Sequence, residues 1–95
     1  MEGQASISAD ILARYAGDAA LEVEGVLELA GRRGAKVTGE NGAVQVELHL
    51  VVEWGASIPA VGRLVQERVR EYLWNMADVE PAVVEVVVDA VGPQS

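Results

Sequence analysis

The stretch AVQVELHLVVEW, from Ala43 to Trp54, decides the fold. Apolar and polar residues alternate along it with a period of two, which is typical of a strand with one buried face. The side chains predicted on the core face are Val44, Val46, Leu48, Leu50, Val52 and Trp54, and those on the other face are Gln45, Glu47, His49, Val51 and Glu53. His49, the single histidine of the chain, is therefore expected to point away from the core.

Two further strands are predicted before this stretch. Asn41 and Gly42 indicate a type I′ hairpin turn, because Asn-Gly tolerates the positive φ angles that this turn requires. The strand that enters the turn lies in AKVTGE, which begins at Ala35. VLEL, from Val26, is short and rich in aliphatic residues, and it predicts another strand.

Two helices are predicted, one before these strands in the chain and one after them. Ser8 can cap a first helix over residues 9–22, and Ser57 can cap a second that ends within MADVEP at residues 76–81. Pro59 is tolerated in the first turn of the second helix. The apolar stripes expected to face the core are Ile11, Leu12, Tyr15, Ala16, Ala19 and Val23 in the first helix, and Ile58, Val61, Val65, Val69, Tyr72, Leu73 and Met76 in the second.

A last strand is predicted in AVVEVVVDAV, which begins at Ala82. The fold class is therefore α/β, of the α+β type, with the order α-β-β-β-α-β. Two helices packed on one face of a small three- or four-stranded mixed sheet bury both helical stripes, and they leave the other sheet face uncovered. We expect a single domain over residues 6–91, with short flexible termini at 1–5 and 92–95. Alternation in the last strand places Val84, Val86, Val88 and Ala90 toward the helices and Val83, Glu85, Val87, Asp89 and Val91 on the uncovered face.

Composition restricts the class of function. With 95 residues, of which 51% are hydrophobic, the chain can form one core, but so small a domain buries a modest share of its surface and gains from association. The formal charge of −8 disfavours binding to nucleic acid and unaided docking on an anionic membrane. The absence of cysteine excludes disulfides and thiolate sites. Because no signal peptide or membrane span is evident, we expect a cytoplasmic protein without direct membrane insertion.

No catalytic, cofactor-binding or metal site is predicted. Glu47, His49 and Glu53 project to the same side of their strand and could form an acid-base or metal cluster. A solvated polar face is the favoured interpretation, because one histidine without cysteine needs two or three well-placed carboxylates to complete a ligand set. The serines lack a nucleophile-elbow motif, so an enzyme is not expected.

The loop Gly31-Arg32-Arg33-Gly34 is the candidate for contact with RNA or another phosphate ligand. Glycines permit close backbone approach, and guanidinium groups bind phosphate oxygens. The GxxG spacing resembles the loop of KH-type RNA-binding domains, but that loop joins two helices, whereas this one is expected to join two strands. Trp54 and Trp74 could stack on bases, although packing at the edge of the core is the favoured interpretation.

The uncovered sheet face offers a second candidate site, for a protein partner. Its predicted members are His49, Val51, Val83, Val87 and Val91, interleaved with acidic residues. Valines exposed in this way could form a partly apolar patch suited to self-association or to a partner protein. The competing interpretation is that valine is common in strands whatever their environment. Both interpretations remain open at this point.

Two parts of the chain resemble the bacterial alkaline shock protein family. The first is AALEVEGV, from Ala19 to Val26. The second is a strand followed by Trp54-Gly55, then SIP at residues 57–59 and a helix containing Val65, Gln66 and Val69. The resemblance spans residues 7–91. Relatives usually have Met-Thr-Gly where this chain has Met-Ala-Asp at 76–78, and tyrosine where it has tryptophan at 54.

The resemblance implies a small, non-enzymatic cytosolic protein without a cofactor. In Gram-positive bacteria such general-stress proteins are linked to the response to cell-envelope stress. Some are held peripherally at the inner membrane face by a membrane-anchored relative, and some self-associate into oligomers. The resulting hypothesis is a protein-binding or scaffolding module. The alternative hypothesis is an RNA or phosphate-ligand binding module that uses the loop with Arg32 and Arg33.

Overall fold

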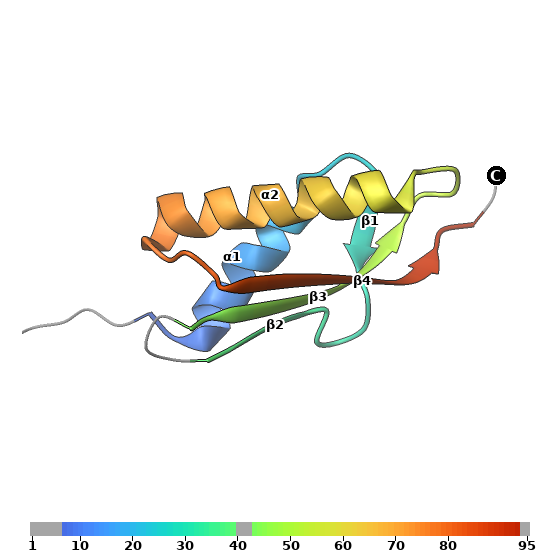
Figure 1. Cartoon of the computed structure of the whole chain (residues 1–95). Coiled ribbons are helices and arrows are strands. Elements are labelled where there is room, and N and C mark those ends of the chain that lie inside the picture. Colours follow the sequence, from blue (N-terminus) through green and yellow to red (C-terminus); the bar gives the residue numbers. More distant parts are fainter. Residues whose placement is uncertain (1–6, 40–42, 94–95) are drawn as a thin grey trace, which may run out of the picture.

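A computed structural model describes residues 7–39 and 43–93 of the chain (Figure 1). Its elements are α1 (Ala9–Leu21), β1 (Val26–Leu29), β2 (Ala35–Thr38), β3 (Gln45–Val52), α2 (Ile58–Ala77) and β4 (Val83–Val91). The predicted order α-β-β-β-α-β and the predicted fold class are confirmed. The predicted turn at Asn41 and Gly42 lies outside the described residues, as do the termini at 1–5 and 94–95.

β3 is the central strand of the four-stranded sheet. β1 pairs antiparallel with its C-terminal half, from Val26 opposite Val52 to Leu29 opposite Leu50. β2 pairs antiparallel with its N-terminal half, so these two short strands share one edge of β3. β4 pairs with the other edge and runs parallel to β3, which makes the sheet mixed. A parallel neighbour requires a long crossover connection, and α2 supplies it.

Both helices lie on the same side of the sheet (Figure 1). α1 packs against β1 and β2, α2 packs against β4, and the two helices pack against each other. The core between these layers is formed by side chains that are almost fully buried: Val46, Leu48, Leu50 and Val52 of β3 and Val61, Val65, Val69 and Leu73 of α2. Each such aliphatic side chain stabilises the folded state by about 1.5–3 kcal/mol relative to exposure to water.

The predicted helix starts are confirmed by their capping contacts. The Oγ of Ser8 accepts a hydrogen bond from the Ile11 N–H at 3.2 Å, and the Oγ of Ser57 accepts one from the Ala60 N–H at 3.3 Å. At the other end of α2, Asp78 adopts a left-handed conformation with φ of 58°. Its N–H donates to the last turn of the helix, so the chain leaves α2 at the segment predicted to end it.

The predicted packing of both tryptophans at the edge of the core is wrong. β3 ends at Val52. The Glu53 N–H still donates to the Gly25 carbonyl at 2.8 Å, and the chain then turns at Trp54 and Gly55. Trp54 therefore lies beyond the last core-facing position and is 60% exposed. Trp74, on the outer side of α2, is 55% exposed. Three residues assigned to the helical stripes are also exposed, namely Ile11, Ile58 and Met76. The core is filled instead by the small side chains of α1 and by the row from Val61 to Leu73 in α2.

Two β-bulges change the alternation that the sequence suggests. In β1 the register skips Leu27, and in β4 it skips Asp89. After the bulge in β4, Ala90 pairs with Val51 and Val91 pairs with the buried Val52. The faces predicted for Ala90 and Val91 are therefore wrong, because an extra residue in one strand reverses the phase of everything that follows it.

Candidate functional site

The sheet face away from the helices is called the open face here. Its positions follow from the register of the four strands, because paired residues in adjacent strands point to the same side. It comprises Glu28 of β1, Lys36 and Thr38 of β2, Gln45, Glu47, His49 and Val51 of β3, and Val83, Glu85, Val87, Asp89 and Ala90 of β4. Four of the five residues predicted as a partner surface lie there, and Val91 does not.

His49 lies between two carboxylates at the centre of the open face. Its Nε2 is 2.6 Å from an Oε of Glu47, two residues earlier in β3. Its Nδ1 is 3.0 Å from an Oδ of Asp89 in the bulge of β4. The side chain is 29% exposed, so the ring is partly screened from water. A neutral imidazole donates from one nitrogen only, whereas the protonated ring can donate from both, so this geometry favours the cation.

The two carboxylates raise the pKa of His49 above its usual value. The hydrogen bond with Glu47 is the larger cause, and the hydrogen bond with Asp89 is the next. Both contacts favour the charged imidazolium, and they outweigh the opposing effect of desolvation. The arrangement is a triad of one imidazole and two carboxylates, which is ion-paired when the ring is protonated. The open-face neighbour of His49 in register on β4 is Val87.

Glu53, which alternation placed on the same side as Glu47 and His49, does not join them. Glu53 follows the end of β3, and Asp89 from the adjacent strand occupies the place beside the ring. The two carboxylates bind opposite nitrogens of the imidazole, so the three side chains do not converge on one point. Within residues 7–39 and 43–93, no group of three His, Cys, Asp or Glu side chains is arranged to hold a metal ion.

We expect an NMR titration to show that the pKa of His49 lies above the ordinary value of 6.5. Because folding raises the pKa, the protonated His49 stabilises the folded state. This contribution is complete below about pH 6.5, the pKa of the unfolded chain, and it is lost as the pH rises through the folded-state pKa. Glu47→Gln removes the larger cause and should lower the pKa. Glu53→Gln, outside the triad, is the matched control and should leave it unchanged. A wild-type pKa at or below 6.5 would contradict the triad.

Apolar residues of the open face lie on the same two strands as the triad. Val51 and Val87 are half-buried, and Val83 at the start of β4 is 47% exposed. Leu27, the extra residue of the β1 bulge, is also exposed, and its side chain lies against Gly92 just after β4. The register skips Leu27, so the open face as defined above does not include it, and the alternation of so short a strand gives no sign of such a bulge.

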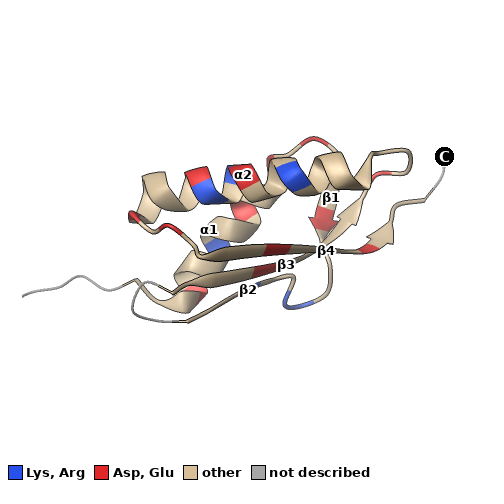
Figure 2. Cartoon of the chain, in the orientation of Figure 1, with Lys and Arg blue, Asp and Glu red and all other residues tan. Residues whose placement is uncertain are grey.

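The glycine-arginine loop joins β1 to β2, as predicted, and Arg32 and Arg33 are exposed. Figure 2 shows basic residues in this loop and acidic residues on β3 and β4. A hollow of about 410 Å³ between the loop and α1 is lined by Arg14 and Arg32, but also by Asp10 and Asp18. A phosphate group placed there would therefore meet carboxylates as well as guanidinium groups.

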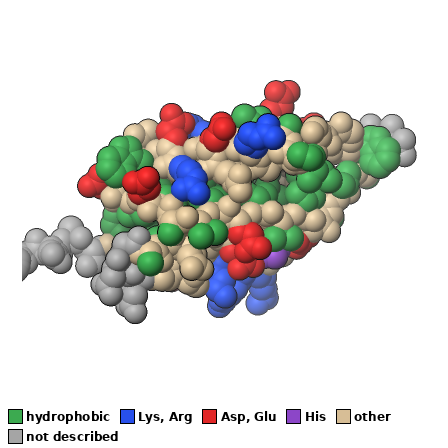
Figure 3. Space-filling view, viewed as in Figure 1, with side chains coloured by type: hydrophobic (Ala, Val, Ile, Leu, Met, Phe, Trp, Pro, Cys, Tyr) green, Lys and Arg blue, Asp and Glu red, His purple; other side chains and the backbone are tan. Residues whose placement is uncertain are grey.

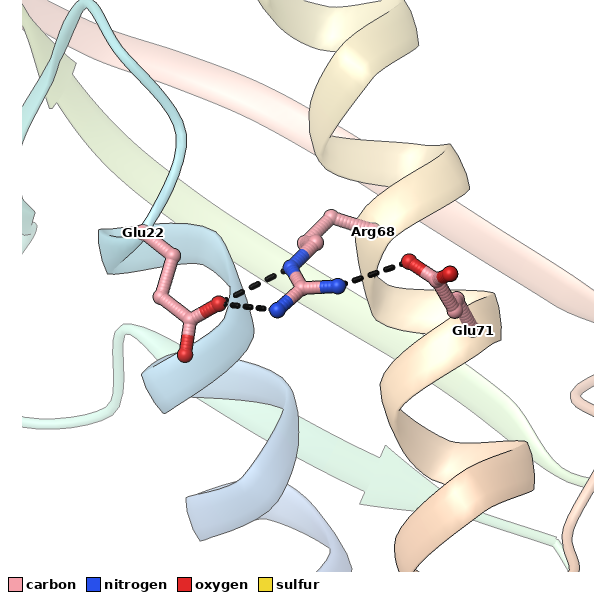
Figure 4. Close-up of polar contacts among 3 residues, drawn as sticks. All are labelled: Glu22, Arg68 and Glu71. Carbon is pink, nitrogen blue, oxygen red and sulfur yellow. Dashed lines mark hydrogen bonds and ion pairs between the residues drawn. The ribbon is translucent and has the colours of Figure 1, made fainter.

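Arg68 of α2 forms the other polar cluster, which sequence reasoning missed (Figure 4). Its guanidinium donates to Glu22 at the end of α1, with Nε 2.8 Å from the carboxylate, and to Glu71 one turn along α2 at 2.6 Å. It also lies 5.9 Å from the centre of the Tyr72 ring, which in turn packs against Tyr15 of α1. These contacts join the two helices, so we assign the cluster a structural role. The three-residue spacing of Arg68 and Glu71 in a predicted helix was the sequence signal that could have predicted their ion pair.

Comparison with known proteins shows a match to a protein family. Residues 1–93 match the model of the alkaline shock protein 23 family, which has a cell envelope-related function. The chain is 31% identical to the uncharacterized protein YqhY of Bacillus subtilis (strain 168), over 97% of this chain and 78% of YqhY. It is 26% identical to the uncharacterized protein Spy1535 of Streptococcus pyogenes serotype M6, over 94% of this chain and 79% of that protein.

Solved structures share the fold at low identity. A doubly substituted MamM-CTD has a TM-score of 0.67 and 13% identity, and the match covers 88% of this chain and 95% of that chain. The manganese form of another MamM CTD variant has a TM-score of 0.60 and 13% identity, over 87% of this chain and 99% of that chain. At this level of identity the likeness concerns the fold alone. Neither described helix of the present chain is both long and apolar enough to cross a membrane.

Proposed function

Because the chain belongs to the alkaline shock protein 23 family, whose function is cell envelope-related, we propose that it is a protein-binding or scaffolding module of the envelope stress response. It acts without catalysis or a cofactor, and it self-associates through the open face. It stays in the cytoplasm and reaches the inner membrane face peripherally, through a membrane-anchored protein partner. The formal charge of −8 supports a protein anchor, because anionic lipids repel an acidic surface.

The observation that carries this proposal is the apolar surface of the open face. Val83 is 47% exposed, and Val51 and Val87 are half-buried in the isolated chain, although they belong to the two longest strands. Apolar surface on one side of an uncovered sheet is stabilised when a second protein covers it. Lys36 and Glu85 lie at opposite ends of one cross-strand row, on either side of Glu47, so a twofold axis through the row pairs Lys36 of each copy with Glu85 of the other. The same axis brings the two Glu47 side chains together, and each of them is already bound to its own His49.

Val87→Glu tests self-association through the open face. A carboxylate buried between two copies without a partner should weaken the assembly by about 2 kcal/mol or more, which is more than tenfold in the dissociation constant. Sedimentation velocity should therefore show a shift to smaller species, while far-UV circular dichroism stays unchanged. Val91→Glu is the matched control, because Val91 is exposed on the same strand but lies on the other side of the sheet. Identical species for the wild type and Val87→Glu would contradict the proposal.

RNA or phosphate-ligand binding at the Gly31–Gly34 loop is the alternative. It is supported by a second hollow beside the loop, which is lined by Arg32, Arg33 and Lys36. Asp10 lines the same hollow, and the strong net negative charge opposes a polyanion, so this function has less support. Salt-sensitive binding of a labelled oligonucleotide that disappears when both arginines are replaced by alanine would favour it over the protein-binding role.

A further inference from the structure

The outer edge of β4 has backbone groups that no described strand uses. β4 pairs with β3 along one edge, and the described sheet ends there. The Val84 carbonyl accepts a hydrogen bond from the side-chain amide of Gln66 at 3.0 Å, so it points to the outer edge. Successive residues of a strand direct their backbone groups to opposite edges, so residues two apart share an edge. The N–H and C=O groups of Val86 and Val88 therefore point outward, as those of Val84 do.

A groove runs along this edge, between β4 and α2. Figure 1 shows α2 extending along β4, and Figure 3 shows hydrophobic side chains between the two elements. The groove has a volume of about 380 Å³ and is lined by Ile58, Pro59, Gly62, Arg63, Gln66, Val86 and Val88. Gly62 leaves the groove wide, because a Cβ atom at this position would have no neighbour within 4 Å.

We propose that this groove binds an extended segment of another protein, which adds a strand to the sheet next to β4. The segment pairs with the outward N–H and C=O groups of Val86 and Val88, and alternate apolar side chains enter the groove beneath α2. Its other side chains are basic and lie on the open-face side, beside Glu85 and Asp89. The proposal extends the protein-binding role to a second surface, and it does not require self-association through the open face.

Charge favours this occupant over a second copy of the chain whose β4 pairs about Val87. If two β4 strands paired antiparallel about Val87, Glu85 of one copy would lie opposite Asp89 of the other, and like charges in that position repel. A segment with lysine or arginine at alternate positions places opposite charges there instead. Arg63 lines the groove itself, so basic side chains are disfavoured on the groove side. The segment should therefore alternate apolar and basic residues.

Both ends of the site limit the length of the segment. The hydrogen bond from Gln66 occupies the edge at Val84, and the bulge at Asp89 ends the regular spacing of the backbone groups. Between these points the edge accommodates about five residues of an extended chain, at about 3.3 Å per residue.

The test uses a capped, fluorescein-labelled nine-residue peptide in which valine alternates with lysine. Fluorescence anisotropy should show saturable binding to the wild-type chain. Gly62→Leu fills the groove and should weaken binding at least tenfold. It should also fold, because the site has room and leucine favours a helix more than glycine does. Asn75→Leu is the matched control, because it adds the same side chain at an exposed position farther along α2, and it should bind like the wild type.

Two further measurements separate strand addition from other kinds of binding. Amide hydrogen exchange should show new protection at the N–H groups of Val86 and Val88 when the peptide binds. A peptide of the same composition, with its valines and lysines in separate blocks, should bind at least tenfold more weakly. Equal binding of the two peptides would show that charge alone attracts them, and this result would overturn the proposal.

Three other results would overturn it as well. They are no binding by the wild type, undiminished binding by Gly62→Leu, and a wild-type dimer in sedimentation that Gly62→Leu disperses, which would assign the groove to a second copy. Failure of the open-face proposal has a different readout, because it appears as an unchanged assembly state of Val87→Glu.

Discussion

Replacing Leu50 by alanine should lower the free energy of unfolding by about 2–5 kcal/mol. Leu50 is fully buried in β3, the strand that pairs with all three others, and it faces the layer of helices. The substitution loses the transfer free energy of the side chain and leaves a cavity that rigid neighbours fill only partly. A domain of this size has a total stability of roughly 5–15 kcal/mol, so the loss is a large fraction of it. Urea unfolding followed by circular dichroism measures the difference.

Leu64→Ala provides the control for this prediction. It removes the same atoms from α2, where Leu64 is 50% exposed, and it should change the free energy of unfolding by no more than about 0.5 kcal/mol. Equal losses for the two variants would show that β3 is not the centre of the core.

Gly25→Ala should lower the free energy of unfolding by about 1–3 kcal/mol. Gly25 has a φ of 102°, which a residue with a Cβ adopts only with strain. The added Cβ would also lie 2.9 Å from a methyl group of Val61, which is itself buried against the core. Movement of this backbone to relieve the contact would weaken the hydrogen bond from the Glu53 N–H to the Gly25 carbonyl, which ties the start of β1 to the end of β3.

Gly62→Ala is the matched substitution and should have the opposite sign. Gly62 lies within α2 and its Cβ would meet open space, so alanine should stabilise the chain by up to about 1 kcal/mol through its higher helix propensity. Thermal or urea unfolding of the two variants together distinguishes strain at residue 25 from a general effect of glycine replacement. A stabilising Gly25→Ala would show that the positive φ is not required there.

The two proposed surfaces meet at β4. Val87 points to the open face, whereas Val86 and Val88 point into the groove beneath α2. One strand can therefore present a broad apolar face to another copy and a backbone edge to an extended segment. Glu85 and Asp89 belong to the open face and also lie beside the edge. Basic residues of the segment should therefore lie next to them, and Lys36 of a second copy should lie opposite Glu85.

Much of the fold was predictable because its signals are local. The alternation in β3 assigned its core face correctly from Val46 to Val52, and Ser8 and Ser57 marked the helix starts. The candidate site was predictable only in part. Alternation placed Glu47, His49, Val51 and Val87 on the open face, but it could not show that Asp89 binds the histidine. These two residues are 40 positions apart, and their contact depends on strand register.

The sequence by itself determined the order of elements, the helix caps and the face of β3 that enters the core. These features arise from spacing and capping between residues close together in the chain. Tertiary structure alone decided the bulges at Leu27 and Asp89, the exposure of Trp54 and Trp74, the triad around His49 and the groove beside β4. Each of these depends on how one strand or helix is placed against another, and distant segments settle that together when they pack.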